Sequence, residues 1–144
     1  MTIPEAYAFL LAPRKTQAEI HKLIMKREAL HGCLLPAGIR YDLDKVQTSP
    51  SDRMSAIEAE IVDMSREIDQ LMKKKLDQIE MIADAIARVR NDTEQIILTG
   101  YYLSGLSMRQ ISETIHYTVR GANKIRQRAV RHLAESVPEV PAHI

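Results

Sequence analysis

The sequence is poor in aromatic residues and in cysteine. It has no tryptophan, one phenylalanine and one cysteine, Cys33, among its 144 residues. A single cysteine cannot form an intramolecular disulfide bond, and the shortage of aromatic rings predicts a core of aliphatic and methionine side chains. No apolar run approaches the ~20 residues of a membrane span, and no basic segment followed by an apolar run resembles a signal peptide. We therefore expect a cytoplasmic protein with no membrane partner.

Motifs that carry catalysis are also missing. The chain has no Ser, His and Asp constellation, no glycine-rich phosphate loop and no HExxH-like box. Asp77, Glu80 and Asp84 lie on one side of an expected helix, which suggests either acid-base or metal chemistry or a hydrated face, and the hydrated face is the usual case. His31 and Cys33 are an incomplete metal site. We expect no enzymatic activity, no cofactor and no metal.

What is present is a strong helical periodicity, which predicts an all-α protein with two long helices over residues 14–34 and 51–90. Steps of three and four give the first helix one stripe, and in the second helix they form the seam of a coiled coil, which Lys75 interrupts and which resumes on a shifted stripe. The stripes consist of Thr16, Ile20, Leu23, Arg27, Leu30 and Leu34; of Met54, Ile57, Ile61, Met64, Ile68 and Leu71; and of Leu76, Ile79, Ile82, Ile86 and Val89.

These two helices predict an antiparallel hairpin over residues 14–90. Its linker, residues 35–50, contains Pro36, Gly38 and Pro50, and it is either functional or mobile. Because the first helix is about half as long as the second, part of the long stripe needs another cover. We expect a homodimer through the hairpin, or packing against the C-terminal domain.

Residues 1–13 predict a short N-terminal apolar helix that Pro13 ends or kinks. Tyr7, Phe9, Leu10 and Leu11 give it an apolar patch. Such a patch suits either a membrane-surface anchor or packing on the fold or on a partner subunit. The absence of Lys or Arg before the patch favours packing.

The stretch from Ser107 to Leu133 has the spacing of a helix-turn-helix motif. Ser107 and Gln110 form a capping box, and Thr118 caps the second helix after a three-residue turn. His116 lies where such a turn prefers a left-handed glycine. A catalytic or metal-binding histidine would need polar partners nearby, and none is seen. The positions that should be apolar or small for a close crossing of the two helices are Ile111, Ser112, Ile115, Tyr117, Ala122 and Ile125.

A supporting helix over residues 94–103 completes a domain that we place at residues 91–135. Asp92 and Gln95 can form its capping box, and Gly100 permits close packing. Its expected packing residues are Ile96, Ile97, Tyr101 and Leu103. Residues 136–144, which contain two prolines, predict a flexible tail.

The second helix of the motif, residues 119–133, is basic on one side. With Ala122, Ile125, Ala129 and Leu133 turned inward, its outward face carries Arg120, Asn123, Lys124, Gln127, Arg128 and Arg131. Residues 107–133 hold six Lys or Arg and one Glu, whereas the whole chain has a net charge of only +1. This local charge indicates a nucleic-acid surface, and its alternative is a solvated helix face. The acidic residues 51–72 should face away from DNA, and Lys73 to Lys75 are either solvated or in contact with phosphate.

The run from Thr93 to Leu133 resembles region 4 of the sigma-70 family, in which a serine-capped helix precedes a recognition helix that closes on an Arg-rich segment. Residues 16–135 also resemble small phage and prophage transcription regulators of the ArpU and RinA type from low-GC Gram-positive bacteria, most specifically in YTVRGANKIRQRAV. The resemblance implies a helical hairpin joined to a tri-helical helix-turn-helix domain, and it implies that residues just after the cap read base edges in the major groove. It places Val119, Arg120 and Lys124 over bases and Asn123, Arg128 and Arg131 on phosphates.

Arg109, Thr118 and Gln127 complete the predicted DNA-binding set. Two positions depart from the pattern, because Val119 cannot donate a hydrogen bond and Gly121 weakens the helix by up to ~1 kcal/mol relative to alanine. We expect a sequence-specific transcription regulator that binds double-stranded DNA. No segment matches the separate promoter-melting domain of a complete sigma factor. The alternative is an adaptor or inhibitor that docks on RNA polymerase or another transcription factor.

Overall fold

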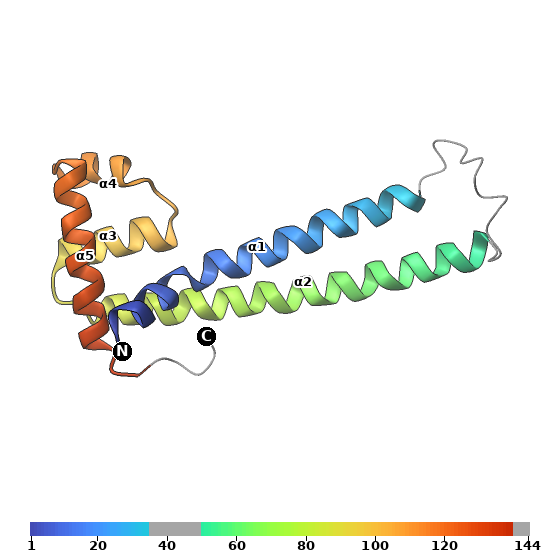
Figure 1. Ribbon diagram of the computed structural model, residues 1–144, viewed down its shortest axis with the longest axis horizontal. Helices are drawn as coiled ribbons and strands as arrows, with labels where there is room; N and C mark the ends of the chain where they lie inside the picture. Colours follow the sequence, from blue (N-terminus) through green and yellow to red (C-terminus); the bar gives the residue numbers. More distant parts are fainter. Residues whose placement is uncertain (35–49, 140–144) are drawn as a thin grey trace. The chain divides into compact units, whose positions relative to one another are not determined.

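The computed structural model describes residues 1–34 and 50–139, and all of its regular structure in these ranges is helical (Figure 1). The all-α prediction is therefore confirmed. Residues 35–49 of the expected linker at 35–50 lie outside the described residues, and Pro50 is the first residue of the second long helix. The elements are α1 (Ile3–Leu34), α2 (Pro50–Ala87), α3 (Asp92–Leu98), the π-helical turn η2 (Thr99–Leu103), α4 (Met108–Ile115) and α5 (Val119–Ser136).

The chain divides into two compact units, one of residues 16–74 and one of residues 1–15 with 75–144. In the first unit, the parts of α1 and α2 that belong to it run antiparallel, side by side (Figure 1). The predicted seam is buried at its centre, at Ile20, Ile61, Met64 and Ile68. This unit confirms the helical hairpin.

The core of the second unit joins three helices that are distant in sequence. Phe9 and Leu10 of α1 pack with Ile82 and Ile86 of α2 and with Leu133 of α5, and all five are buried. A smaller cluster, Ile97, Ile111 and Ile125, connects α3, α4 and α5. The apolar N-terminal segment therefore packs on its own fold, as the sequence favoured.

Of the two outcomes expected at Pro13, an end of the helix or a kink, the end is wrong. α1 is one helix of 32 residues that passes through Pro13. Proline removes the N–H that would bond to the Phe9 carbonyl, but α1 is anchored on both sides by buried residues, Phe9 and Leu10 before Pro13 and Ile20 after it. Tertiary packing thus outweighs one missing hydrogen bond.

The second half of the α2 stripe has a cover within its own unit. The stripe residues Ile82, Ile86 and Val89 pack there against α1 and α5. Packing against the C-terminal part of the chain, one of the two covers expected from the sequence, is therefore confirmed, although Met54 and Leu76 of the predicted stripes are exposed.

The start of α3 also differs from the expected capping box. Asn91, not Asp92, is the N-cap, and its side chain accepts a hydrogen bond from the backbone N–H of Glu94 at 3.1 Å. Asn91 has the extended backbone of a cap residue. Gln95 instead donates from Nε2 to the carbonyl oxygen of Val89 at 2.5 Å. The connection after α2 is therefore the short segment 88–91.

α5 continues to Ser136, beyond the expected end at Leu133. Val137 is buried, and its N–H donates to the carbonyl oxygen of Leu133 at 3.1 Å. The α-amino group of Met1 donates to the carbonyl oxygens of Ala134 and Val137. The predicted flexible tail therefore does not begin at residue 136, and residues 140–144 lie outside the described residues.

Candidate nucleic-acid interface

Two short helices and a three-residue turn form the centre of the C-terminal unit. At the start of α4, Ser107 Oγ accepts from the Gln110 backbone N–H at 3.2 Å, and Gln110 Oε1 accepts from the Ser107 N–H at 2.9 Å. At the start of α5, Thr118 Oγ1 accepts from the Gly121 N–H at 3.0 Å. The predicted capping box and the predicted cap are both confirmed, and Gly121 leaves the second box unclosed because it has no side chain.

The turn between the helices is left-handed at His116, as predicted. This residue has φ 62° and ψ 40°, and it is the one non-glycine residue with positive φ in the described ranges. The N–H of Tyr117 closes the end of α4 by donating to the Ser112 carbonyl oxygen at 3.0 Å. In residues 1–34 and 50–139, no three His, Cys, Asp or Glu side chains gather as metal ligands.

The close crossing of α4 and α5 depends on small and apolar residues. Ile111, Ser112, Ala122 and Ile125 are buried, as expected, and Ile115 is partly buried. A Cβ atom on Gly100 would lie 3.4 Å from Ile111 Cδ1, so the glycine does permit close packing.

Two residues expected to pack do not. Tyr117 is 53% exposed, because it follows the left-handed residue and lies over the first turn of α5 near Gly121. Ile96 is 48% exposed, because α3 buries Glu94, Ile97 and Leu98, which form its opposite face. Tyr101 and Leu103 are partly buried and pack against the core, as expected, and Tyr102, which the sequence had not singled out, is buried.

The outward side of α5 carries a continuous line of polar residues. Ala122, Ile125, Ala129 and Leu133 are buried as predicted. The exposed line opposite them, which we call the basic stripe, consists of Arg120, Lys124, Gln127 and Arg131. These residues follow steps of four, three and four, so they share one face of the helix. Val119 lies beside the stripe at the start of α5 and is 43% exposed.

One arginine of α5 points into its own unit. Arg126 Nη1 donates to the Tyr102 hydroxyl at 3.0 Å, and its guanidinium lies 4.7 Å from the centre of the Tyr101 ring. Arg126 also contacts Asn123 Oδ1 at 3.4 Å. Asn123, which was predicted to contact phosphate, therefore uses its amide oxygen within the protein, and Arg126 is removed from the outward charge.

The same aromatic pair also holds α1. Arg14 lies 4.7 Å from the centre of the Tyr101 ring and donates to the Tyr101 carbonyl oxygen at 2.6 Å. Burial raises the pKa of the Tyr102 hydroxyl above its usual value, and the hydrogen bond from Arg126 opposes that shift. This cluster joins α1 and α5 to the Tyr101 and Tyr102 rings of their own unit, although the buried Nε of Arg126 has no hydrogen-bond partner in the described part of the chain.

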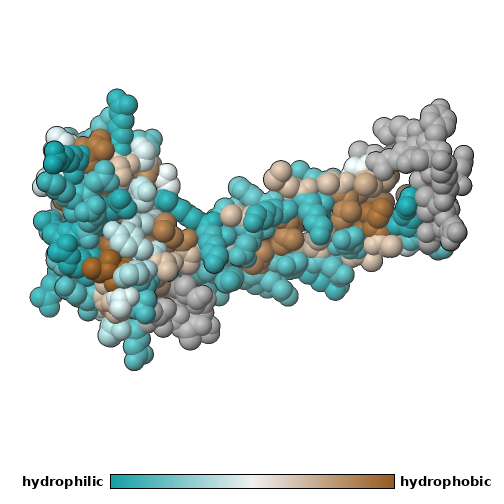
Figure 2. Space-filling model, in the orientation of Figure 1, coloured by the Kyte–Doolittle hydropathy of each residue, from teal (hydrophilic) through white to brown (hydrophobic). Residues whose placement is uncertain are grey.

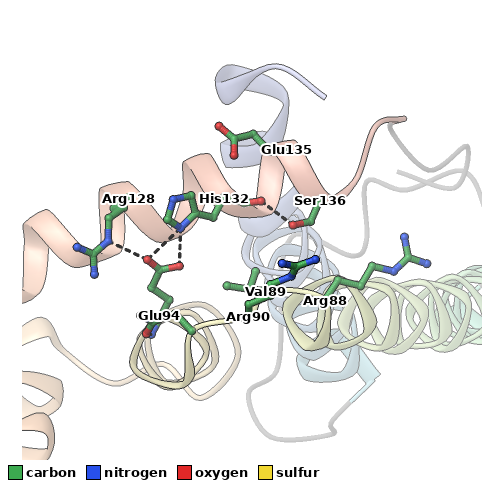
Figure 3. Close-up of a pocket in the computed structure, with 9 residues that line it drawn as sticks. Arg88, Val89, Arg90, Glu94, Arg128, His132, Glu135 and Ser136 are labelled. Carbon is green, nitrogen blue, oxygen red and sulfur yellow. Dashed lines mark hydrogen bonds and ion pairs between the residues drawn. The ribbon is translucent and has the colours of Figure 1, made fainter.

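Arg128 is shared between the surface and a buried carboxylate (Figure 3). Its Nε donates to Glu94 Oε1 at 2.8 Å, and His132 Nδ1 lies 2.8 Å from Glu94 Oε2. The Glu94 side chain is 1% exposed, whereas that of Arg128 is 50% exposed. Sequence reasoning missed this contact, because α3 and α5 are joined here by residues 34 positions apart.

The remaining predicted residues are accessible (Figure 2 shows how polar residues dominate the visible face of this unit). Arg109 has only a distant partner, Glu113 at 3.9 Å, and both side chains are highly exposed. Exposed ion pairs of this kind contribute little to stability, so the Arg109 side chain can bind another group at little cost. Thr118 is exposed, but its hydroxyl serves as the α5 cap.

A pocket of about 500 Å³ opens beside the Glu94 carboxylate (Figure 3). No sequence pattern indicated this pocket, because its walls come from separate elements. They are formed by Arg88, Val89, Arg90, Asn91, Glu94, Arg128, His132, Glu135 and Ser136.

Two further findings bear on the class of protein. Within the described residues, no helix combines the length and the apolar character needed to cross a membrane. Comparison of the chain with protein-family models, with curated proteins and with solved structures found no match.

Proposed function

We propose that this chain is a sequence-specific DNA-binding transcription regulator that places α5 in the major groove of double-stranded DNA. The observation that carries the proposal is the exposed basic stripe on the second helix of a helix-turn-helix. This helix is the one that enters the groove in such motifs. A major groove admits one α-helix, and arginine and lysine side chains can donate to base edges there.

The residues divide by their place along α5. Arg120 and Lys124 lie near its start, where side chains reach base edges, and exposed Val119 can contact a thymine methyl group. Arg131 and the outer end of Arg128 lie farther along and suit phosphates. Arg109, on α4, suits the phosphate backbone that the first helix of the motif crosses.

The resemblance to sigma-70 region 4 and to phage transcription regulators supports the same function. It adds transcription as the process, the cytoplasm as the location and a phage or prophage as the origin. Process, location and origin are all part of the proposal. DNA sequences selected by binding can be compared with promoters and operators to test the role in transcription.

The test is selection of bound sequences from a random duplex pool, followed by salt titration of variants. We expect Arg120→Ala to lower affinity by ~1 to 3 kcal/mol and to relax preference at one position. Arg131→Ala should weaken binding to every duplex alike and reduce the salt slope by about 1. Lys22→Ala, an exposed change in the hairpin unit, is the matched control. Failure of the unmodified protein to bind any duplex at low salt would refute the proposal.

The second candidate function is protein docking. One observation favours it, a surface groove of about 620 Å³ between α3 and α4 that includes exposed Ile96 and Leu106. Binding of purified RNA polymerase by a chain that binds no duplex DNA would support this adaptor role. Loss of that binding in Ile96→Ser, with unchanged folding, would assign it to the groove.

Pairing of two copies through the hairpin is a separate proposal. Val62 and Met72 of α2 are about half exposed, at 49% and 51%, and exposed apolar side chains of this kind are candidates for burial by a second chain. A mass measurement in solution tests the pairing. A symmetric selected DNA site would agree with it, because paired motifs read paired half-sites.

A further inference from the structure

The pocket beside Glu94 lies at the edge of the basic stripe. Arg128, which lines the pocket, follows Gln127 of the stripe directly and lies four residues after Lys124. Residues one helical turn apart are neighbours on a helix surface. Arg88 and Arg90, from the connection between α2 and α3, line the pocket on its other side (Figure 3). The pocket and the stripe therefore form one continuous surface.

The lining is rich in arginines that have no carboxylate partner. Neither the Arg88 side chain nor the Arg90 side chain forms an ion pair or hydrogen bond with any residue in the described part of the chain. Of the two lining carboxylates, Glu94 is paired with Arg128, which leaves the charges of Arg88 and Arg90. Only Glu135 then opposes the positive charge of the lining.

The backbone that carries these two arginines is held firmly. Val89, which lies between them, is 2% exposed and packs in the core, and its carbonyl oxygen accepts from Gln95. Asn91 caps α3 directly after them. Arg88 and Arg90 are exposed on either side of the buried Val89. Because the main chain here is already ordered, binding of a ligand by these two side chains carries no cost for ordering the backbone.

Arg128 also presents a fixed donor. Because Glu94 holds its Nε, the two terminal amino groups of the guanidinium remain on the half-exposed side. A guanidinium binds phosphate oxygens through paired N–H groups. The guanidinium groups of Arg128 and Arg88 point in opposite directions at the two sides of the pocket (Figure 3), so the three arginines suit successive phosphates of a nucleic-acid backbone.

We infer that Arg88, Arg90 and the outer end of Arg128 bind the DNA phosphate backbone on one side of the major groove that α5 enters. This inference rests on the proposed function and extends it to a site outside the helix-turn-helix. The continuity of the pocket with the basic stripe favours a duplex over a small free anion. The site supplies affinity and orientation and no base preference, because phosphate contacts carry no sequence information.

The test is the double variant Arg88→Gln/Arg90→Gln in the full chain. We expect affinity for all duplexes to fall on the order of tenfold at about 0.1 M salt, with the selected sequence preference unchanged. The slope of log affinity against log salt should fall by about 1.8, because each phosphate contact contributes about 0.9. Lys22→Gln/Lys26→Gln removes the same charge from exposed positions of α1 in the other unit, and it should leave both quantities unchanged.

The outcomes separate this inference from the proposed function. If Lys124→Ala and Arg131→Ala weaken binding while Arg88→Gln/Arg90→Gln matches the unmodified protein, the phosphate site is refuted and the function stands. If the unmodified protein binds no duplex, the function itself fails. Titration with inorganic pyrophosphate, followed by amide chemical shifts, provides a third arm. Loss of pyrophosphate binding in the arginine variant without any loss of duplex affinity would refute DNA as the ligand.

Discussion

The contact between Glu94 and Arg128 allows a sharp prediction about stability. The carboxylate is buried at 1% exposure, whereas the arginine is 50% exposed, and the two are joined at 2.8 Å. Loss of Arg128 leaves a buried charge with one partner fewer, but loss of the Glu94 charge leaves an arginine that water can reach. Arg128→Ala should therefore destabilise the protein more than the isosteric Glu94→Gln does.

The magnitudes follow from this asymmetry. Removing one partner of a fully buried ion pair costs about 3 to 5 kcal/mol. Solvent reaches Arg128 and His132 remains beside Glu94, so we expect about 2 kcal/mol for Arg128→Ala. Glu94→Gln keeps the shape and a hydrogen-bonding oxygen, and it should cost about 1 kcal/mol or less. In the presence of Glu94→Gln, Arg128→Ala should cost only about 0.5 kcal/mol, since no charge is then left unpaired.

Urea unfolding of the four proteins in this double-mutant cycle measures the coupling directly. We expect a coupling of about 1.5 kcal/mol between Glu94 and Arg128. The exposed pair Arg109 and Glu113, 3.9 Å apart, is the matched control, and its coupling should be below about 0.5 kcal/mol. A larger loss for Glu94→Gln than for Arg128→Ala, or equal couplings in the two pairs, would refute the reasoning.

Four further substitutions test the backbone and a buried hydroxyl. Gly105 has φ +72° with open space where a Cβ atom would lie, so Gly105→Ala should lower the free energy of unfolding by about 1 kcal/mol. His116 is also left-handed, so His116→Gly should raise the free energy of unfolding by up to about 1 kcal/mol. Urea unfolding measures both. Pro13→Ala should raise the thermal midpoint by restoring the N–H for the Phe9 carbonyl, and a lower midpoint would mean that the packing of α1 requires proline. Burial raises the pKa of the Tyr102 hydroxyl in the folded protein above 10.0. As the pH rises, this tyrosine therefore loses its proton in the unfolded protein before it does so in the folded protein. The stability advantage over Tyr102→Phe should then hold below about pH 10 and decline above it in urea titrations.

Features that depend on a few adjacent residues were predictable from the sequence. The capping box of Ser107 and Gln110, the cap at Thr118 and the left-handed His116 all involve contacts within one turn of chain. The buried face of α5 was equally predictable, because apolar spacing at about 3.6 residues per turn reports which side of a helix leaves water. These local rules sufficed for the all-α class, the hairpin and the helix-turn-helix.

The composition of the polar surface depended on tertiary contacts. The sequence placed Arg128 on the outward face of α5 and assigned no role to Arg126, but it disclosed neither the contact of Arg126 with Tyr102 nor that of Arg128 with Glu94. A charge pattern cannot reveal such partners, because they lie 24 and 34 residues away along the chain. The corrected cap at Asn91 shows the same limit at short range, since several neighbouring polar residues could each have capped α3.

The sequence by itself determined which segments are helical and which face of each helix is apolar, because those properties arise from neighbours within one or two turns. Only the tertiary structure decided that α1 continues through Pro13, since the buried residues on both sides of the proline outweigh one lost hydrogen bond. It alone also brought Arg88 and Arg90 beside Arg128. Such a meeting of distant charges depends on how the core packs, and core packing is a property of the whole unit.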